Sequence, residues 1–404
     1  MNILLITDQY PPEIRAISFM MQELAEFFAD KGHIVTVITS MPQPELVENE
    51  ADINIPILDF KNGVKVIRVK TPFKIQKGYV HKALNQLAIP TLFFRNIKKL
   101  VKGNIDAVIA YTPPLPLGLV GIKVKEVYGA KFLLNIQDIF PQNAIDLGIL
   151  NNKYLIKYFK RMENRIYKGA DKITAHTNGG KEYLIKTNNI QKEKISTINN
   201  WLDFKDYEYA QNKNIFRKKY GLENKFIFLF AGIMGPAQNL DFIIQIAEMI
   251  TDLPDVYFLF LGEGSAKKRL QKKVKNHKLE NVVFKGFVTK DEYACLAKEV
   301  DVGLVSLSAK NKTPVMPGKI LGFMAASIPI VAFLHKDSDG HDLIKQAKCG
   351  YSLVPDNLDE ATKLIRMVYE EKNKIKKLGK NGYKYAEKNF SKEKCIDKIK
   401  QLIE

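Results

Sequence analysis

The order of apolar runs along the chain constrains the fold more than any other feature. Short β-type runs such as NILLIT (2–7) and HIVTVITS (33–40) flank the helix-type segment FMMQELAEFFADKG (19–32). A strand, a helix and a further strand in this order form a βαβ unit with parallel strands. The alternation starts again at KFIFLFAG (225–232) and continues to IPIVAF (328–333). The sequence therefore predicts two successive parallel-sheet domains.

The length of the chain agrees with this division, because 404 residues exceed one ordinary hydrophobic core. We expect an α/β protein with two doubly wound, Rossmann-like domains facing across a cleft, with ligands at the carboxyl ends of the strands. The predicted boundaries are a first domain over 1–199, a polar linker over 200–214 and a second domain over 215–385. A C-terminal helix over 386–404 completes the chain and could cross back to the first domain.

Composition indicates a globular cytoplasmic protein. The chain is 46% hydrophobic and 26% charged, and its N-terminus has neither a cationic lead nor a small-residue cleavage site. Its apolar runs are too short for a membrane-spanning helix. Cys295, Cys349 and Cys395 are odd in number and lack metal-type spacing, which argues against a disulfide or zinc framework.

The net charge of +18 has two interpretations: solvated lysine faces, or an acidic partner. Segment 151–169, NNKYLIKYFKRMENRIYKG, interleaves basic and aromatic residues as a membrane-surface helix does. Segment 78–104, which contains Phe93 and Phe94, is a second candidate. We expect contact with an anionic membrane surface through the first domain, and no nucleic acid, because no recognition motif appears.

Three glycine-bearing turns follow strands of the second domain. They are FAGIMGPAQNLD (230–241), LGEGSAKKRL (261–270) and PGKILGF (317–323), each leading into a helix. Helix N-termini and glycine turns bind phosphate, whereas any one such turn is also explained by packing. None of the three matches the Walker or dinucleotide-binding pattern. Their common position favours a phosphorylated ligand.

The order of several motifs resembles a known family. The motifs are YPPE (10–13), YTPPLPLGLVG (111–121), LLNIQDIFPQNAIDLGIL (133–150), FAGIMGPAQNLD (230–241) and MPGKILGFMAASIPIVA (316–332). Together they resemble the retaining family-4 glycosyltransferases of the glycosyltransferase-B fold. The bacterial branch that moves N-acetylated amino or deoxyamino sugars in surface-polysaccharide synthesis is most similar. The resemblance implies a nucleotide diphosphate donor, UDP-linked in our interpretation, a lipid-linked or saccharide acceptor, and a peripheral position on the inner face of the cell membrane.

The resemblance also assigns residues. Donor contacts fall on Gly232, Gly235, Gln238, Asn239, Gly262, Glu263, Gly264, Phe287, Val288, Pro317, Gly318, Lys319 and Asp339. Acceptor contacts fall on Pro12, Glu13, Arg15, Gln137 and Asp138. Two of these are the expected catalytic residues: Lys319 stabilises charge on the leaving diphosphate, and Asp138 orients the acceptor hydroxyl or the donor sugar. Asp138 could instead be only a helix N-cap.

The chain departs from the family pattern at four positions. Gln238 stands where a Lys is frequent, Pro314 and Gly322 stand where two Glu residues are expected, and Gln137 replaces a frequent His. Recognition of the ribose must then be absent or pass to the backbone or to Asp339. His176 is read as a strand-end residue rather than a catalytic one.

A metal site and two other functions remain to be weighed. Asp337, Ser338 and Asp339 form an Asp-x-Asp that could hold a cation, or could form an Asx-type turn that caps the helix from His341. We favour the turn and expect no metal and no other cofactor. The family resemblance implies front-face transfer, and it agrees with the lack of a carboxylate pair at a spacing that suggests double displacement. A nucleotide-sugar 2-epimerase and a catalytically silent nucleotide-sugar-binding protein are the alternatives.

Overall fold

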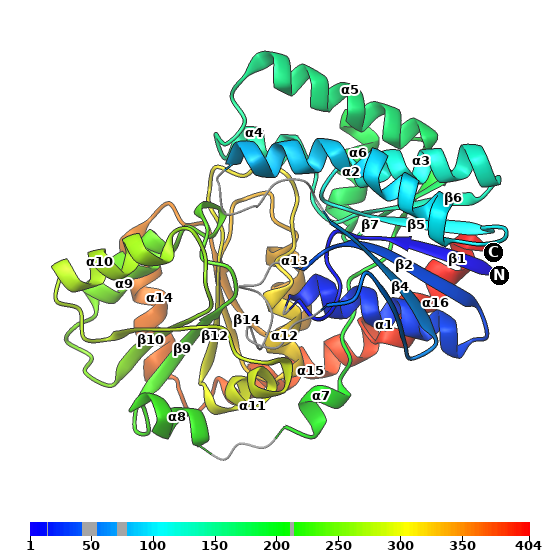
Figure 1. Cartoon of the computed structure of the whole chain (residues 1–404). Helices are drawn as coiled ribbons and strands as arrows, with labels where there is room; N and C mark the ends of the chain where they lie inside the picture. The colour runs from blue at the N-terminus through cyan, green and yellow to red at the C-terminus, as the bar shows by residue number, and fades with distance from the viewer. Residues whose placement is uncertain (14, 43–54, 71–78, 211–213) are drawn as a thin grey trace. The chain divides into compact units, whose positions relative to one another are not determined.

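The computed structural model describes residues 1–13, 15–42, 55–70, 79–210 and 214–404, and side chains within α2 from Asn85 onward (Figure 1). The chain divides into two compact units. The first comprises Met1–Ile145, Leu150–Asn199 and Cys395–Glu404, and the second comprises Asp146–Ile149 and Asn200–Lys394. Each unit is an α/β layer structure built on its own sheet, as the alternation of apolar runs predicts.

The sheet of the first unit has the strand order β3-β4-β2-β1-β5-β6-β7-β8. All neighbours are parallel except β3, which pairs antiparallel with β4. The strands are β1 (Asn2–Ile6), β2 (Ile34–Ser40), β3 (Leu58–Lys61), β4 (Val64–Val69), β5 (Ala107–Thr112), β6 (Lys131–Ile136), β7 (Lys172–Ala175) and β8 (Ile195–Thr197). The sequence analysis missed β3 and β8, because both are short edge strands with little apolar periodicity.

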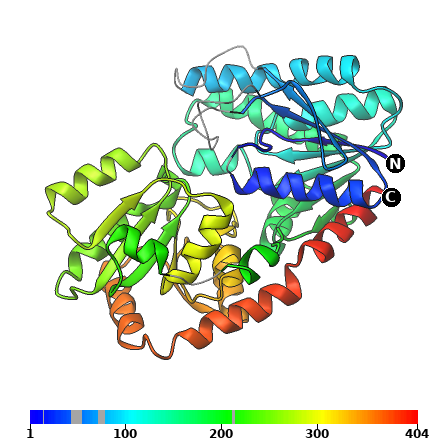
Figure 2. The same cartoon turned by 60° about the horizontal axis from the view of Figure 1, so that its bottom comes forward.

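Helices cover both faces of this sheet. They are α1 (Ala16–Asp30), α2 (Tyr79–Leu100), α3 (Leu117–Tyr128), α4 (Gln142–Asp146), α5 (Lys153–Gly169), α6 (Asn178–Asn188) and α16 (Lys392–Ile403). In Figures 1 and 2, α2, α3 and α5 lie over one face, and α1 and α16 lie over the other. Strands buried on both sides in this way read as continuous apolar runs, which is why the sequence revealed them.

The sheet of the second unit is wholly parallel, in the order β11-β10-β9-β12-β13-β14. Its strands are β9 (Phe226–Ala231), β10 (Val256–Leu261), β11 (Val282–Lys285), β12 (Val302–Ser306), β13 (Ile330–Phe333) and β14 (Gly350–Leu353). The strand order changes direction between β9 and β12, so the connections leaving their carboxyl ends go to opposite faces. Ligands bind at such a switch point in open α/β sheets.

Two buried clusters cover the faces of this second sheet. One contains side chains of α11, α12 and α13, and the other contains side chains of α9, α10 and α14. The helices of the unit are α7 (Lys205–Glu208), α8 (Ile215–Tyr220), α9 (Leu240–Met249), α10 (Lys267–Asn276), α11 (Lys290–Glu299), α12 (Lys319–Ala325), α13 (Gly340–Ala347), α14 (Leu358–Glu370) and α15 (Lys376–Asn389).

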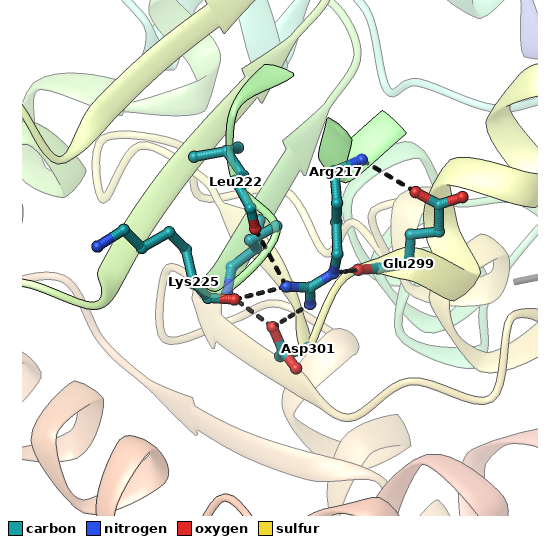
Figure 3. A network of polar contacts seen from close by, with 6 residues as sticks. Arg217, Leu222, Lys225, Glu299 and Asp301 are labelled. Carbon is teal, nitrogen blue, oxygen red and sulfur yellow. Dashed lines mark hydrogen bonds and ion pairs between the residues drawn. The ribbon is translucent and has the colours of Figure 1, made fainter. Parts of the chain in front are cut away.

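A polar network fastens α8 to the sheet (Figure 3). The buried carboxylate of Glu299 accepts hydrogen bonds from the backbone N–H groups of Ile215, Phe216 and Arg217, at 2.8, 2.8 and 3.0 Å. The guanidinium of Arg217 donates to the carbonyl of Lys225 at 2.6 Å and to Asp301 at 2.7 Å. An anion thus fills the N-terminus of α8, where unpaired N–H groups favour negative charge.

The structure corrects two expectations about helices. The C-terminal segment is two helices rather than one over 386–404, since α15 ends at Asn389 and α16 begins at Lys392. Between them, the carbonyl of Phe390 accepts a hydrogen bond from the backbone N–H of Leu202, at the start of the predicted linker.

The second candidate for a membrane-surface helix is segment 78–104, and the structure describes its side chains from residue 85 onward. In this part, Phe93 is fully buried and Phe94 packs against the core. Those two aromatic side chains are therefore core residues. None of the described helices is long and apolar enough to cross a bilayer.

Candidate active site

The turn after β9 is built around Gly232. Its φ is 128°, a value that favours glycine, and a Cβ added there would lie 2.9 Å from Cε of Lys319. The glycine therefore leaves room for the lysine stem. Further along the turn, a Cβ at Gly235 would meet no atom within 4 Å, so the backbone there is open. A short 3₁₀ turn over Pro236–Gln238 follows, and α9 begins at Leu240.

Lys319 is the first residue of α12, and its ammonium lies against the β9 turn. Its Nζ donates a hydrogen bond to Oε1 of Gln238 at 3.0 Å and lies 5.0 Å from the ring centroid of Phe230. Burial lowers the pKa of Lys319 from 10.5 to about 8, because the charged form loses hydration. The structure therefore brings together three residues of the predicted donor set: Gly232, Gln238 and Lys319.

The glycines after β10 have a packing explanation. A Cβ at Gly262 would lie 2.1 Å from the carbonyl oxygen of Gly232, and one at Gly264 would lie 2.4 Å from that of Met234. The two turns are also hydrogen-bonded, since the backbone N–H of Met234 donates to the carbonyl of Glu263 at 2.8 Å. Close packing of the two turns therefore accounts for both glycines, whether or not a ligand binds there. Their contact with a donor remains a prediction.

The remaining donor residues lie on two further turns of the same sheet. Phe287 and Val288 follow β11, and Val288 packs against the core just before Thr289 caps α11. The carboxylate of Glu263 lies 2.5 Å from Nζ of Lys267 and 3.6 Å from where a Cβ at Gly286 would stand.

At the start of α12, Pro317 is buried and Gly318 is exposed. A Cβ at Gly318 would meet nothing within 4 Å, so this backbone is accessible.

Gly322, where the family pattern predicts a Glu, lies one turn after Lys319 in α12. A Cβ at Gly322 would lie 3.4 Å from the hydroxyl oxygens of both Tyr207 and Tyr293. Two phenols therefore occupy the space into which a longer side chain would point. The sequence analysis did not foresee that these two phenols lie beside Gly322.

The Asp-x-Asp segment lies after β13. Asp339 precedes α13 but makes no side-chain capping bond, and the hydroxyl of Ser338 accepts from the backbone N–H of Gly340 at 3.2 Å instead. The expected turn before the helix is therefore present, but the hydroxyl of Ser338 forms it in place of Asp339. His341 lies 2.8 Å from the hydroxyl of Ser352. No group of three or more potential metal ligands gathers within the described ranges.

In the first unit, Asp138 follows β6. The residue is half-buried, and burial of its carboxyl raises the pKa of that group above the usual value. The negative charge of Asp138 in turn raises the pKa of the buried Tyr111 phenol, in addition to the larger effect of burial. The first following helix, α4, begins only at Gln142, so Asp138 is not its N-cap. A desolvated carboxyl at the end of a strand is typical of functional sites.

The other predicted acceptor residues lie at the ends of neighbouring elements. Gln137 donates a hydrogen bond from its side chain to Asn135 at 2.7 Å. Glu13 is buried, Pro12 is exposed, and Arg15 is half-buried at the start of α1. Only β5 lies between β1 and β6 in the sheet. The segment after β1, which contains Pro12 and Glu13, and the segment after β6, which contains Gln137 and Asp138, therefore leave the same edge of one sheet. Their contact with an acceptor remains a prediction.

His176 follows β7, as the sequence analysis expected of a strand-end residue. It is buried, and its carbonyl accepts from the side chain of Asn199 at 2.9 Å. The residues that sequence reasoning missed are the aromatic ones around the polar groups: Phe230, Tyr111, Tyr207 and Tyr293. Phe230 carried a weak signal, since it is the last aromatic residue of a strand that ends in a glycine turn. Tyr111 opens the motif YTPPLPLGLVG (111–121) but was not singled out, and Tyr207 and Tyr293 carried no signal.

Comparison with known proteins identifies the family. A model described as "Glycosyltransferase Family 4" matches residues 17–206, and one described as "Glycosyl transferases group 1" matches residues 212–385. The chain belongs to the family-4 glycosyltransferases. This family-4 glycosyltransferase is a retaining, nucleotide-sugar-dependent enzyme, and its family is generally metal-independent.

Relatives and solved structures agree with that assignment. The putative colanic acid biosynthesis glycosyl transferase WcaI of Escherichia coli is 23% identical over 80% of this chain and 81% of its own. The probable glycosyltransferase WbjE of Pseudomonas aeruginosa is 24% identical over 74% of each chain. The structure of Anabaena HepE in complex with UDP-glucose superposes with a TM-score of 0.73, at 16% identity over 99% of this chain and 98% of that one. The glycosyltransferase-B fold is thereby shown.

Proposed function

We propose that this family-4 glycosyltransferase moves an N-acetylated amino or deoxyamino sugar from a UDP-linked donor to a lipid-linked or saccharide acceptor in surface-polysaccharide synthesis. The observation that carries the proposal is Lys319, a desolvated ammonium aimed at an open glycine turn. Two named relatives, the colanic acid transferase and a poly(ribitol-phosphate) alpha-N-acetylglucosaminyltransferase of Staphylococcus aureus, support the polymer and the sugar class. The UDP-glucose complex of Anabaena HepE supports the base.

In this proposal the second unit binds the donor and the first binds the acceptor. The acceptor hydroxyl oxygen forms a bond to C1 of the sugar while the bond from C1 to the diphosphate oxygen breaks. The hydroxyl proton passes to the leaving diphosphate on the same face, so the configuration at C1 is retained. Lys319 stabilises the negative charge that develops on the diphosphate, and Asp138 orients the acceptor hydroxyl or the donor sugar. No step requires a metal or another cofactor.

We also propose that the exposed surface of α5 contacts anionic lipid. Tyr154, Leu155 and Tyr158 have exposed fractions of 72%, 49% and 46%. Lys157 and Arg161 are exposed on the same helix. Aromatic side chains beside basic ones suit the interface of an anionic bilayer. The enzyme would then meet a lipid-linked acceptor at the cytoplasmic surface of the membrane.

The basic residues of α5 are not equivalent. Nζ of Lys160 lies 3.4 Å from Oε2 of Glu163, whose side chain is fully buried. Burial raises the pKa of Glu163, and Lys160 partly opposes this effect. Replacing Lys160 would therefore disturb the interior as well as the surface. A test of membrane binding should leave Lys160 in place.

The experiment that tests the proposed reaction is transfer assayed with purified enzyme and a panel of nucleotide sugars. UDP-N-acetylglucosamine, UDP-N-acetylgalactosamine, their deoxyamino counterparts and UDP-glucose are incubated with undecaprenyl diphosphate-linked sugar in vesicles of anionic lipid. Mass spectrometry follows a product heavier by one N-acetylated sugar, and NMR reads its anomeric configuration. Transfer of glucose alone, or transfer with inversion, would contradict the proposal.

A further inference from the structure

Two residues contact the ammonium of Lys319: Phe230, which has no assigned role, and Gln238, which the family resemblance places among the donor contacts. Nζ of Lys319 has Gln238 on one side, at 3.0 Å, and the ring of Phe230 at 5.0 Å. Phe230 is fully buried within β9, two residues before Gly232. Gly232 leaves space for the lysine stem, since a Cβ there would lie 2.9 Å from Cε. A strand residue, Phe230, and a turn residue, Gln238, thus both contact the ammonium of a lysine that the helix α12 carries.

We infer that Phe230 and Gln238 are positioning residues, which hold the ammonium of Lys319 in the direction of the donor diphosphate. This inference rests on the proposed function, because it assumes that a diphosphate binds at the β9 turn. A lysine side chain has four rotatable bonds and loses much entropy when its end is fixed. The protein fixes it before the donor arrives, so that less entropy is lost on binding.

The chemistry of the two neighbours suits this role better than a carboxylate would. An ammonium has three N–H donors, and the amide oxygen of Gln238 accepts one, which leaves two for phosphate oxygens. The face of Phe230 attracts the cation through its quadrupole and carries no charge. A carboxylate in either place would neutralise the lysine and repel the diphosphate. The two neutral partners hold the charge without cancelling it.

A positioning residue acts only through Lys319, and this gives a sharp test. UDP and uridine binding are measured by calorimetry for wild type, Gln238→Leu, Lys319→Met and the double variant. We expect Gln238→Leu to weaken UDP about tenfold, the order of one hydrogen bond, and to leave uridine unchanged. We expect the double variant to bind UDP as Lys319→Met does, since nothing remains to be positioned.

Phe230→Leu is compared with Phe228→Leu, a control from the same strand. Both rings are fully buried and belong to the same buried cluster, but only that of Phe230 lies beneath Lys319. We expect similar losses of thermal stability from the two changes, and about a tenfold loss of UDP affinity from Phe230→Leu alone. Equal UDP affinities in the two variants would overturn the role of Phe230.

The outcomes separate this inference from the proposed function. If Gln238→Leu weakens UDP by the same factor with and without Lys319, Gln238 contacts the donor itself, so the positioning role is wrong and the proposed function stands. If Gln238→Leu has no effect in either background, Gln238 positions nothing. If wild type binds neither UDP nor inorganic pyrophosphate and transfers no sugar, the proposed donor site falls and the inference falls with it.

Discussion

Replacing Lys319 by Met should raise stability and weaken donor binding at the same time. Met keeps most of the length and the apolar stem of Lys, so it fills the same space beside Gly232. The replacement removes a half-buried charge whose two neighbours, Gln238 and Phe230, are neutral. A residue retained against stability is a sign that the charge serves binding.

The magnitude follows from the pKa. The fall from 10.5 to about 8 on burial corresponds to about 3 kcal/mol of lost hydration in the charged form. Loss of the hydrogen bond to Gln238 and of the contact with Phe230 offsets about 1–2 kcal/mol of this. Lys319→Met should therefore increase the free energy of unfolding by about 1–2 kcal/mol at neutral pH. UDP affinity should fall by about 2–3 kcal/mol, which is the value of a charge-assisted hydrogen bond.

The gain in stability should depend on pH in a defined direction. The pKa of Lys319 is lower in the folded than in the unfolded protein, so the unfolded chain binds more protons between about 8 and 10.5. Wild-type stability therefore rises with pH in that interval relative to the variant. The advantage of Lys319→Met should be complete below pH 8 and should vanish by about pH 10.5.

Calorimetric unfolding of wild type and Lys319→Met across this pH range measures the effect, with UDP titrations on the same samples. Lys345→Met, at an exposed position on α13, is the matched control and should change neither quantity. A variant that unfolds at a lower temperature than wild type at pH 7, or whose advantage does not close at high pH, would refute the burial of an uncompensated charge. Unchanged UDP affinity would refute the role of Lys319 at the diphosphate.

Three further predictions follow from the same structure. Glu299→Gln should lower the free energy of unfolding by about 3 kcal/mol, because it removes a buried anion from the network in Figure 3, and it should leave the UDP affinity of the folded protein unchanged. Denaturant unfolding measures the change, and a loss below about 1 kcal/mol would contradict this prediction. Replacing Lys153, Lys157 and Arg161 together by Gln should abolish co-sedimentation with anionic vesicles at low salt, and added salt should do the same for wild type. Equal partition of both proteins at every ionic strength would exclude the exposed surface of α5 as a membrane contact. Transfer should survive excess EDTA within about twofold, and Asp337→Asn should change it little, whereas restoration of lost activity by Mg²⁺ or Mn²⁺ would show a metal site.

Local signals were sufficient for the fold and for the positions of part of the candidate site. Parallel strands buried on both faces produce apolar runs, and turns at their carboxyl ends carry the residues that face a ligand. The segment AGIMGPAQNLD therefore revealed a strand end, an open turn and the start of a helix. Lys319 was found in the same way, at the first position of α12.

Other features depend on contacts between segments far apart in the sequence. Gly262 and Gly264 were predicted to contact the donor, and the structure adds a packing reason for both, because a Cβ at either would collide with the neighbouring turn. Phe93 looked like a surface anchor until the sheet beneath it was known. The choice between Asp339 and Ser338 as the turn-forming side chain depended on a difference of one residue, which turn statistics do not resolve.

Positions 238, 314 and 322 are neutral in this chain, where the family pattern has a lysine and two carboxylates, and this has one consequence for the donor turn. Of positions 238, 314, 319 and 322, where the family pattern places charge or a phosphate contact, only 319 is charged in this chain. Charge–charge interactions strengthen as the local dielectric falls, so one ammonium in a desolvated setting acts on a diphosphate more strongly than a hydrated one does. Neutral neighbours preserve that strength, because a carboxylate beside Lys319 would hold the cation in competition with the donor. The neutral residues at 238, 314 and 322 are therefore consistent with catalysis concentrated on a single lysine.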